Sequence, residues 1–113
     1  MESNRLVWEM VKPVIERALP DETPSMRLQQ VAVLMTIYAL EAREEVVTAQ
    51  MVTEAYGLSR AQTHRLVTSL VEKGVLHAEQ THNRLGRGRS TALKLIETPE
   101  FAALKAVLTR QQP

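Results

Sequence analysis

Apolar residues in the second half of the chain recur at helical spacing. At about 100° per residue, Leu66, Val67, Leu70 and Val71 share one arc, which predicts an amphipathic helix over residues 60–73 with this arc in the core. The residues on the opposite side of this helix are mostly small and polar, with one positively charged side chain at the centre. An ordinary amphipathic surface helix is the alternative interpretation of this stretch taken alone.

The residues around this helix give it defined ends and a preceding partner. Ser59 stands at the N-cap with Gln62 three residues later, which is the spacing of a capping box. Gly74 occupies the position at which helices often end in the left-handed conformation. Thr48 can cap a shorter helix over residues 49–56, in which Met51, Val52 and Ala55 are available for packing, and Gly57 lies in the tight turn between the two. The pattern therefore predicts a helix-turn-helix.

Two strand-like runs follow and are joined by a basic segment. The first begins at residues 75–76, and the second covers residues 90–96, where apolar and polar positions alternate. The segment between them has no compact apolar set and contains glycine, so it predicts a hairpin tip. The tip residues expected to be exposed are Arg84, Arg87, Gly88 and Arg89. Glycine lets a backbone approach closely and arginine is attracted to a narrow minor groove, although a basic loop can also simply be solvated.

The first half of the chain predicts two further helices. Residues 3–19 have a wide apolar arc, and Pro13 is expected to kink or split them because it lacks an amide donor. Residues 20–25 form a linker, and a helix follows from about Met26 to Arg43. The face of that helix expected to be buried consists of Leu28, Val31, Ala32, Leu34, Met35, Tyr38 and Ala39, and it is widened by Ile37 and Leu40. Residues 46–47 are expected to form a short first strand.

Together these elements predict a mainly helical α+β fold, a winged helix-turn-helix with extra helices at both ends. Thr98 can cap the last helix, with Pro99 at its first position. The expected organisation is an N-terminal helix and linker over residues 1–25, a DNA-binding winged helix over residues 26–97 and a C-terminal helix over residues 98–113.

The distribution of charge supports a contact with nucleic acid. The chain carries a formal net charge of only +1 over 113 residues. Residues 1–56 hold five Lys or Arg and nine Asp or Glu, a charge of −4, whereas residues 57–96 hold seven and two, a charge of +5. A DNA contact needs a local basic patch rather than a high net charge.

Composition narrows the class of protein further. The chain has no cysteine, which excludes disulfides and thiolate metal sites. No apolar run approaches the roughly 18 residues of a membrane span, and the N-terminus does not resemble a secretory signal, so a soluble cytoplasmic protein is expected. His64, His77 and His82 have no nucleophile or carboxylate partner in the sequence, so neither an enzyme nor a cofactor is predicted. A metal site at His77 and His82 is the less common alternative to spare hairpin histidines.

From Leu28 to Glu97 the chain resembles the MarR-like winged-helix regulators. The resemblance is carried by the run from Thr48 to Leu76, with its Gly-Leu-Ser turn, its Thr63-x-Arg65 pair and its Glu-Lys-Gly ending. The wing lacks the usual acidic residue near its tip, and the terminal helices are short for that family. The resemblance implies base reading by residues among Arg60, Gln62 and Arg65.

The residue pattern and the resemblance together define the expected DNA contacts. The recognition-helix residues are Arg60, Ala61, Gln62, Thr63, His64, Arg65, Thr68 and Ser69. Thr63 falls within the apolar arc, so packing is its alternative role. Thr48 and Ser59 are expected to contact phosphates through their hydroxyls or through helix N-termini.

A winged helix does not require the two terminal helices. They are expected to pack against those of a second copy and form a homodimer. The residues expected at the dimer interface are Trp8, Val11, Ile15, Phe101, Leu104 and Leu108. The alternative is that both helices cover the core of the monomer, and Trp8 could also line a ligand pocket. A two-fold dimer would present two recognition helices to successive major grooves.

The leading functional hypothesis is a regulator, specifically a repressor, that binds an inverted repeat in double-stranded DNA as a homodimer. A plasmid or phage protein for partition, replication or transfer control would use the same chemistry. A protein–protein interaction module, in which the wing arginines meet an acidic partner, is the alternative from another class. The sequence does not indicate a small-molecule effector.

Overall fold

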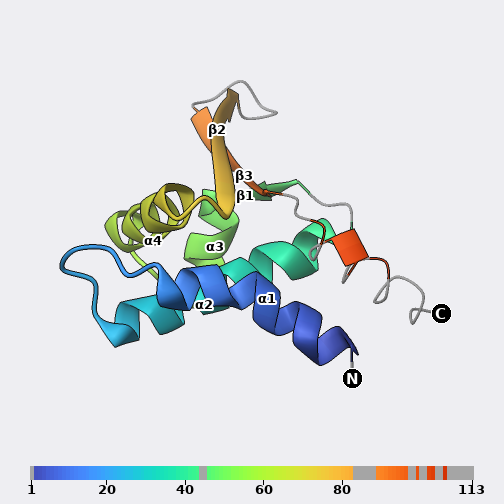
Figure 1. The fold of residues 1–113 in the computed structure, drawn as a ribbon. Helices are drawn as coiled ribbons and strands as arrows, with labels where there is room; N and C mark the ends of the chain where they lie inside the picture. Colours follow the sequence, from blue (N-terminus) through green and yellow to red (C-terminus); the bar gives the residue numbers. More distant parts are fainter. Residues whose placement is uncertain are drawn as a thin grey trace.

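Four helices and a small antiparallel sheet make up the structure, a computed structural model that describes residues 2–43, 46–82 and 89–96 and, beyond them, Pro99, Ala102, Ala103 and Ala106. The elements in order are α1 (Glu2–Glu16), α2 (Pro24–Glu41), β1 (Val47–Thr48), α3 (Ala49–Tyr56), α4 (Arg60–Glu72), β2 (Leu76–His82) and β3 (Arg89–Leu95). In Figure 1, β2 and β3 project from the helices as a hairpin, and α1 lies across α2. The prediction of a mainly helical winged helix-turn-helix is confirmed, whereas most of the predicted C-terminal helix lies outside the described residues.

The central strand of the sheet is β3, because the strand order is β1-β3-β2 and both pairings are antiparallel. Val47 pairs with Leu93, and Leu76 pairs with Leu95, so the buried side chains of all three strands face the helices. The Leu95 amide donates to Glu41 Oε1 at 3.1 Å, which ties the end of α2 to this strand. The base of the hairpin is therefore fixed to the helical core.

The predicted caps are confirmed by the geometry of α3 and α4. The Thr48 hydroxyl accepts from the Met51 amide at 3.2 Å and begins α3. Ser59 and Gln62 form both bonds of the capping box at the start of α4. Gly57 and Gly74 have φ values of 65° and 77°, the left-handed conformation that glycine adopts without a Cβ clash. These local signals set the boundaries of the helix-turn-helix.

The helix boundaries in the N-terminal half differ from the prediction. α1 ends at Glu16 and continues through Pro13, so the expected division of this helix is not found. Pro13 lies in the last turn of α1, so only three residues of the helix follow the amide donor that it removes. α2 begins at Pro24, earlier than expected, because Thr23 caps it by accepting from the Met26 amide at 3.1 Å.

The face that α2 turns to the core was predicted only in part. Leu34, Ile37 and Tyr38 are buried as expected, but Gln30 and Val33, which were not expected on this face, are buried as well. Leu28, Ala32 and Ala39, which were expected to be buried, are exposed. The error has a physical cause, since apolar residues occur around most of α2 and their periodicity does not single out one face.

Two smaller corrections concern the helix-turn-helix. Leu66, Val67 and Leu70 are buried as predicted. Val71 is exposed, because it lies at one edge of the arc that these residues share. In α3, Val52 is buried whereas Ala55 is exposed. The helices α2, α3 and α4 and the sheet share one contiguous core, and Val14 of α1 also belongs to it.

Candidate nucleic-acid interface

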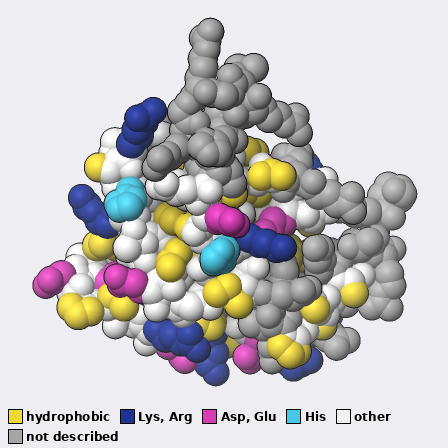
Figure 2. All heavy atoms as spheres, turned by 90° about the horizontal axis from the view of Figure 1, so that it is seen from above, with side chains coloured by type: hydrophobic (Ala, Val, Ile, Leu, Met, Phe, Trp, Pro, Cys, Tyr) yellow, Lys and Arg dark blue, Asp and Glu magenta, His cyan; other side chains and the backbone are white. Residues whose placement is uncertain are grey.

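The polar side of α4 is open to solvent over most of its length. Arg60, Ala61, Gln62, His64, Arg65 and Thr68 are exposed, and Ser69 is half-buried. The opposite side of the helix packs against α2, α3 and β2, which fixes the orientation of the exposed residues. In Figure 2, Lys, Arg and His side chains lie close together on the left, the side on which α4 lies in Figure 1. A helix held in this way can place its exposed side chains in a major groove.

Thr63 is the exception among the residues predicted to face DNA. It is only 2% exposed. Its hydroxyl accepts from Thr53 Oγ1 at 2.7 Å, and Thr53 lies on α3. The packing role that was the alternative for Thr63 is therefore the one the structure shows, because the hydroxyl pair satisfies two polar groups where the two helices cross.

The capping box limits what Gln62 can do. Gln62 Oε1 accepts from the Ser59 amide at 2.9 Å. Bidentate recognition of adenine needs both the oxygen and the amide of a glutamine side chain. While the cap is intact, only the amide group of Gln62 remains to donate to a base. Arg65 has more hydrogen-bond donors to offer to base edges.

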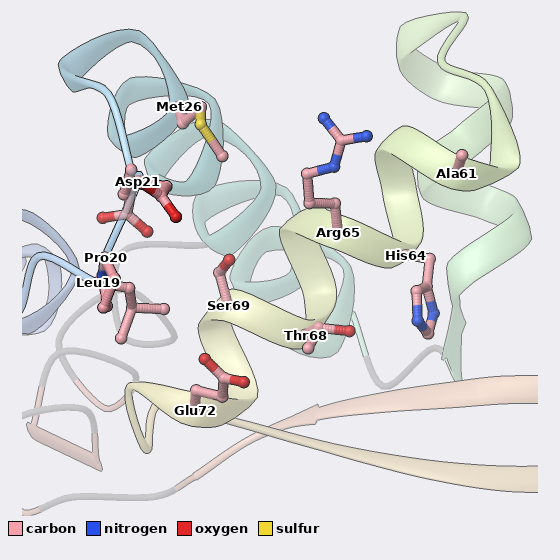
Figure 3. Close-up of a pocket in the computed structure, with 11 residues that line it drawn as sticks. Leu19, Pro20, Asp21, Met26, Ala61, His64, Arg65, Thr68, Ser69 and Glu72 are labelled. Carbon is pink, nitrogen blue, oxygen red and sulfur yellow. The ribbon is translucent and has the colours of Figure 1, made fainter.

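A groove of about 700 Å³ runs along α4 and is bounded by the linker between α1 and α2. Figure 3 shows Arg65 and Ser69 on the side of the helix that faces Asp21 and Met26, whereas His64 points toward the strands. Asp21 adopts a φ of 63°, which turns the linker back beside the helix. The wall at the C-terminal half of α4 is acidic, since Asp21 faces this half and Glu72 lies on it.

A second groove, of about 480 Å³, lies on the other side of α4 between α3 and β3. Gln50, Arg60, His64 and Thr91 are among the residues that line it. The capping hydroxyls Thr48 and Ser59 each accept a backbone hydrogen bond. Each hydroxyl keeps its own hydrogen, which is free to be donated to a phosphate oxygen.

The linker is anchored by a buried ion pair that the sequence pattern did not reveal. Lys73 is 2% exposed, and its ammonium donates at 2.7 Å to each of three oxygens, Glu22 Oε1, Gln30 Oε1 and the Val14 carbonyl. Gln30 Nε2 donates to Glu22 Oε2 at 2.8 Å, and Arg17 donates to the Lys73 carbonyl at 2.6 Å. All three ammonium donors are used, so the charge is fully compensated.

This network fixes the linker beside the C-terminal end of α4. Lys73 caps that end, Glu22 comes from the linker and Gln30 comes from α2. The sequence pattern indicates Lys73 only as part of a helix ending and Glu22 only as part of the linker over residues 20–25. One signal was present: Gln30 shares a helical face with Leu34 and Ile37, and a glutamine among core residues requires a polar partner.

The buried ion pair predicts a loss of stability in acid. Burial by itself raises the pKa of Glu22, but the hydrogen bonds from Gln30 and Lys73 and the Lys73 charge outweigh it and hold the pKa below its ordinary value. The stabilisation is therefore complete above the unfolded-state pKa of about 4.3 and is lost as pH falls through the lower folded-state pKa. Urea unfolding of the wild type and Glu22→Gln from pH 7 to pH 3 should give free energies that differ at pH 7 and converge in acid. A difference independent of pH would contradict this assignment.

Several predicted site residues lie outside the part of the chain that can be described. They are Arg84, Arg87 and Gly88 of the wing and Phe101, Leu104 and Leu108 of the C-terminal segment. The backbone of Arg89 belongs to β3, but its side chain also lies outside the described residues. Of the predicted dimer residues in α1, Trp8 is exposed, Ile15 is half-buried and Val11 is buried in its own chain.

The described residues hold no group of three or more His, Asp or Glu side chains that could bind a metal ion. His64 and His77 are both exposed. Within the same residues, no helix is both long enough and apolar enough to span a bilayer.

The three-helix core, the exposed α4 and the hairpin define a winged helix-turn-helix DNA-binding domain. Residues 17–80, more than half of the chain, match the model of the IclR helix-turn-helix domain. The chain belongs to this family. The winged-helix part of the MarR-like resemblance is thus confirmed, whereas the MarR-like subtype is not.

One solved structure resembles the fold, and it is described as a possible transcriptional regulator from Methanosarcina mazei Go1. The superposition has a TM-score of 0.51 at 13% identity and covers 95% of this chain and 76% of the other. At this identity the likeness concerns the fold alone. No curated protein sequence gives a significant match.

Proposed function

We propose that this chain is a cytoplasmic, sequence-specific transcription regulator that binds an inverted repeat in double-stranded DNA as a homodimer and acts as a repressor. One observation supports it most strongly: α4 is fixed by its buried face, and Arg60, His64 and Arg65 are exposed along its other side. The family match and the regulator with a similar fold support the same class of function.

The two grooves support a division of roles along α4. The acidic wall of Asp21 and Glu72 repels phosphates at the C-terminal half, so the bases are read by the N-terminal half, chiefly by Arg65. On the other side, Arg60 lines the second groove, and we expect it to contact phosphates together with the capping hydroxyls of Thr48 and Ser59. The wing arginines, Arg84, Arg87 and Arg89, would contact the minor groove or the backbone.

Selection from a pool of random duplexes at near-physiological salt tests this proposal. The expected result is enrichment of a palindrome, whose half-site spacing gives the separation of the two α4 helices. Binding should also weaken steeply with salt, because each neutralised phosphate releases counterions. Salt-labile binding without enrichment would exclude a sequence-specific regulator, and the absence of binding would favour the protein–protein module.

A further inference from the structure

Part of the outer side of α2 is an apolar surface without a cover in the described structure. Among the 18 residues of α2, the charged side chains are Arg27 and Glu41. The polar residues Ser25, Gln29 and Thr36 share one narrow sector of the helix, and an apolar sector lies beside it. Here one side faces the core, whereas Leu28 is 70% exposed.

Four residues form a continuous line on this side, which we term the α2 stripe: Leu28, Ala32, Met35 and Ala39. Their spacing of four, three and four residues places them within an arc of about 60°, opposite the buried side. Leu28, Ala32 and Ala39 are exposed, and Met35 is half-buried at the edge. Tyr56 borders the stripe, because its hydroxyl donates to the Ala32 carbonyl at 3.2 Å.

The stripe is complementary to itself when it is reversed. In an antiparallel pair with a two-fold axis between the levels of Val33 and Leu34, Leu28 lies opposite Ala39 of the partner subunit. In the next layer, Ala32 lies opposite Met35 of the partner subunit. Each layer sets a large side chain against a small one, which lets two helices interdigitate at a close separation.

We propose that the α2 stripe is the surface through which two copies of this chain pair as an antiparallel dimer. The stripe carries no charge, so its partner surface should carry none either. A second copy of the stripe meets this condition, and its large and small side chains come in the order that fits the first. The first charged side chain on this side is Arg43, beyond the last turn of the helix. The inference rests on the proposed homodimeric regulator and assigns it an interface that differs from the terminal helices predicted above.

Analytical ultracentrifugation of the full chain tests the interface. The wild type should sediment with twice the chain mass of 12.7 kDa. Leu28→Glu should raise the dimer dissociation constant on the order of 100-fold, because two leucines per dimer leave the interface. Val46→Glu is the matched control, since Val46 is 74% exposed and lies outside α2. A monomeric wild type, or a Leu28→Glu variant that dimerises as the wild type does, would overturn the proposal.

The register is tested by cross-linking, because the chain has no cysteine of its own. A mixture of Leu28→Cys and Ala39→Cys proteins should form disulfide-linked heterodimers faster than either protein forms homodimers. Equal rates would exclude the antiparallel register. Binding of each variant to a single half-site duplex is measured in parallel by fluorescence anisotropy. Half-site binding by a monomeric wild type would refute the dimer and leave DNA binding intact, whereas a dimer without DNA binding would refute only the proposed function.

Discussion

Replacing Lys73 by methionine is expected to lower the free energy of unfolding by about 3–5 kcal/mol. The substitution removes the cation but leaves the Glu22 carboxylate, the Gln30 oxygen and the Val14 carbonyl in a buried site without their donor. An uncompensated buried charge costs far more than the net stabilisation from an exposed ion pair. Urea denaturation followed by circular dichroism at pH 7 measures the loss.

A surface lysine provides the control for this prediction. Lys94→Met changes the same side chain at an exposed position on β3 and should alter stability by no more than about 0.5 kcal/mol. The double variant Lys73→Met/Glu22→Gln should be more stable than Lys73→Met alone, because it removes the unpaired charge as well. A Lys73→Met variant as stable as Lys94→Met would show that the network does not stabilise the fold.

The network also explains how the linker is positioned without secondary structure of its own. Glu22 joins the linker to the end of α4, and Arg17 adds a second bond to the Lys73 carbonyl. Both bonds hold the linker, which forms one wall of the groove that Arg65 lines. Loss of this network should therefore affect the groove as well as the stability of the fold.

The helix-turn-helix could be predicted from the sequence because its signals are local. Ser59, Gln62 and Gly57 each act within a few residues, through a cap or a positive φ, and the structure confirms them. Leu66, Val67 and Leu70 were also predictable, since α4 is polar on its other side and its periodicity is unambiguous.

What could not be predicted depends on contacts between distant segments. Lys73 and Glu22 are 51 positions apart, so nothing in their immediate surroundings indicates the ion pair. Likewise, the buried face of α2 is decided by which elements cover it and not by its own composition. Leu28 and Gln30 show the consequence, because the apolar residue is exposed and the polar one is buried.

Replacing Arg65 by alanine is expected to lower the affinity for the selected site by about 1–3 kcal/mol, which corresponds to roughly 5- to 150-fold. Arg65 is exposed in the groove along α4, while the Gln62 oxygen is held by the cap and the Thr63 hydroxyl is buried. The loss should be accompanied by a relaxed preference at one base pair, because the guanidinium reads that pair directly. An equal loss for all sequences would assign Arg65 to a phosphate instead.

Fluorescence anisotropy on a duplex with one half-site measures this effect without a contribution from dimerisation. Arg43→Ala removes the same charge from an exposed position beyond the end of α2, so it controls for the general electrostatic attraction to DNA. Arg65→Ala should weaken binding to the selected site far more than Arg43→Ala, and the two should differ little on an unrelated duplex. If both variants bind the selected site equally well, base recognition does not depend on Arg65, and the reading residues must be sought among the other exposed residues of α4 or in the wing.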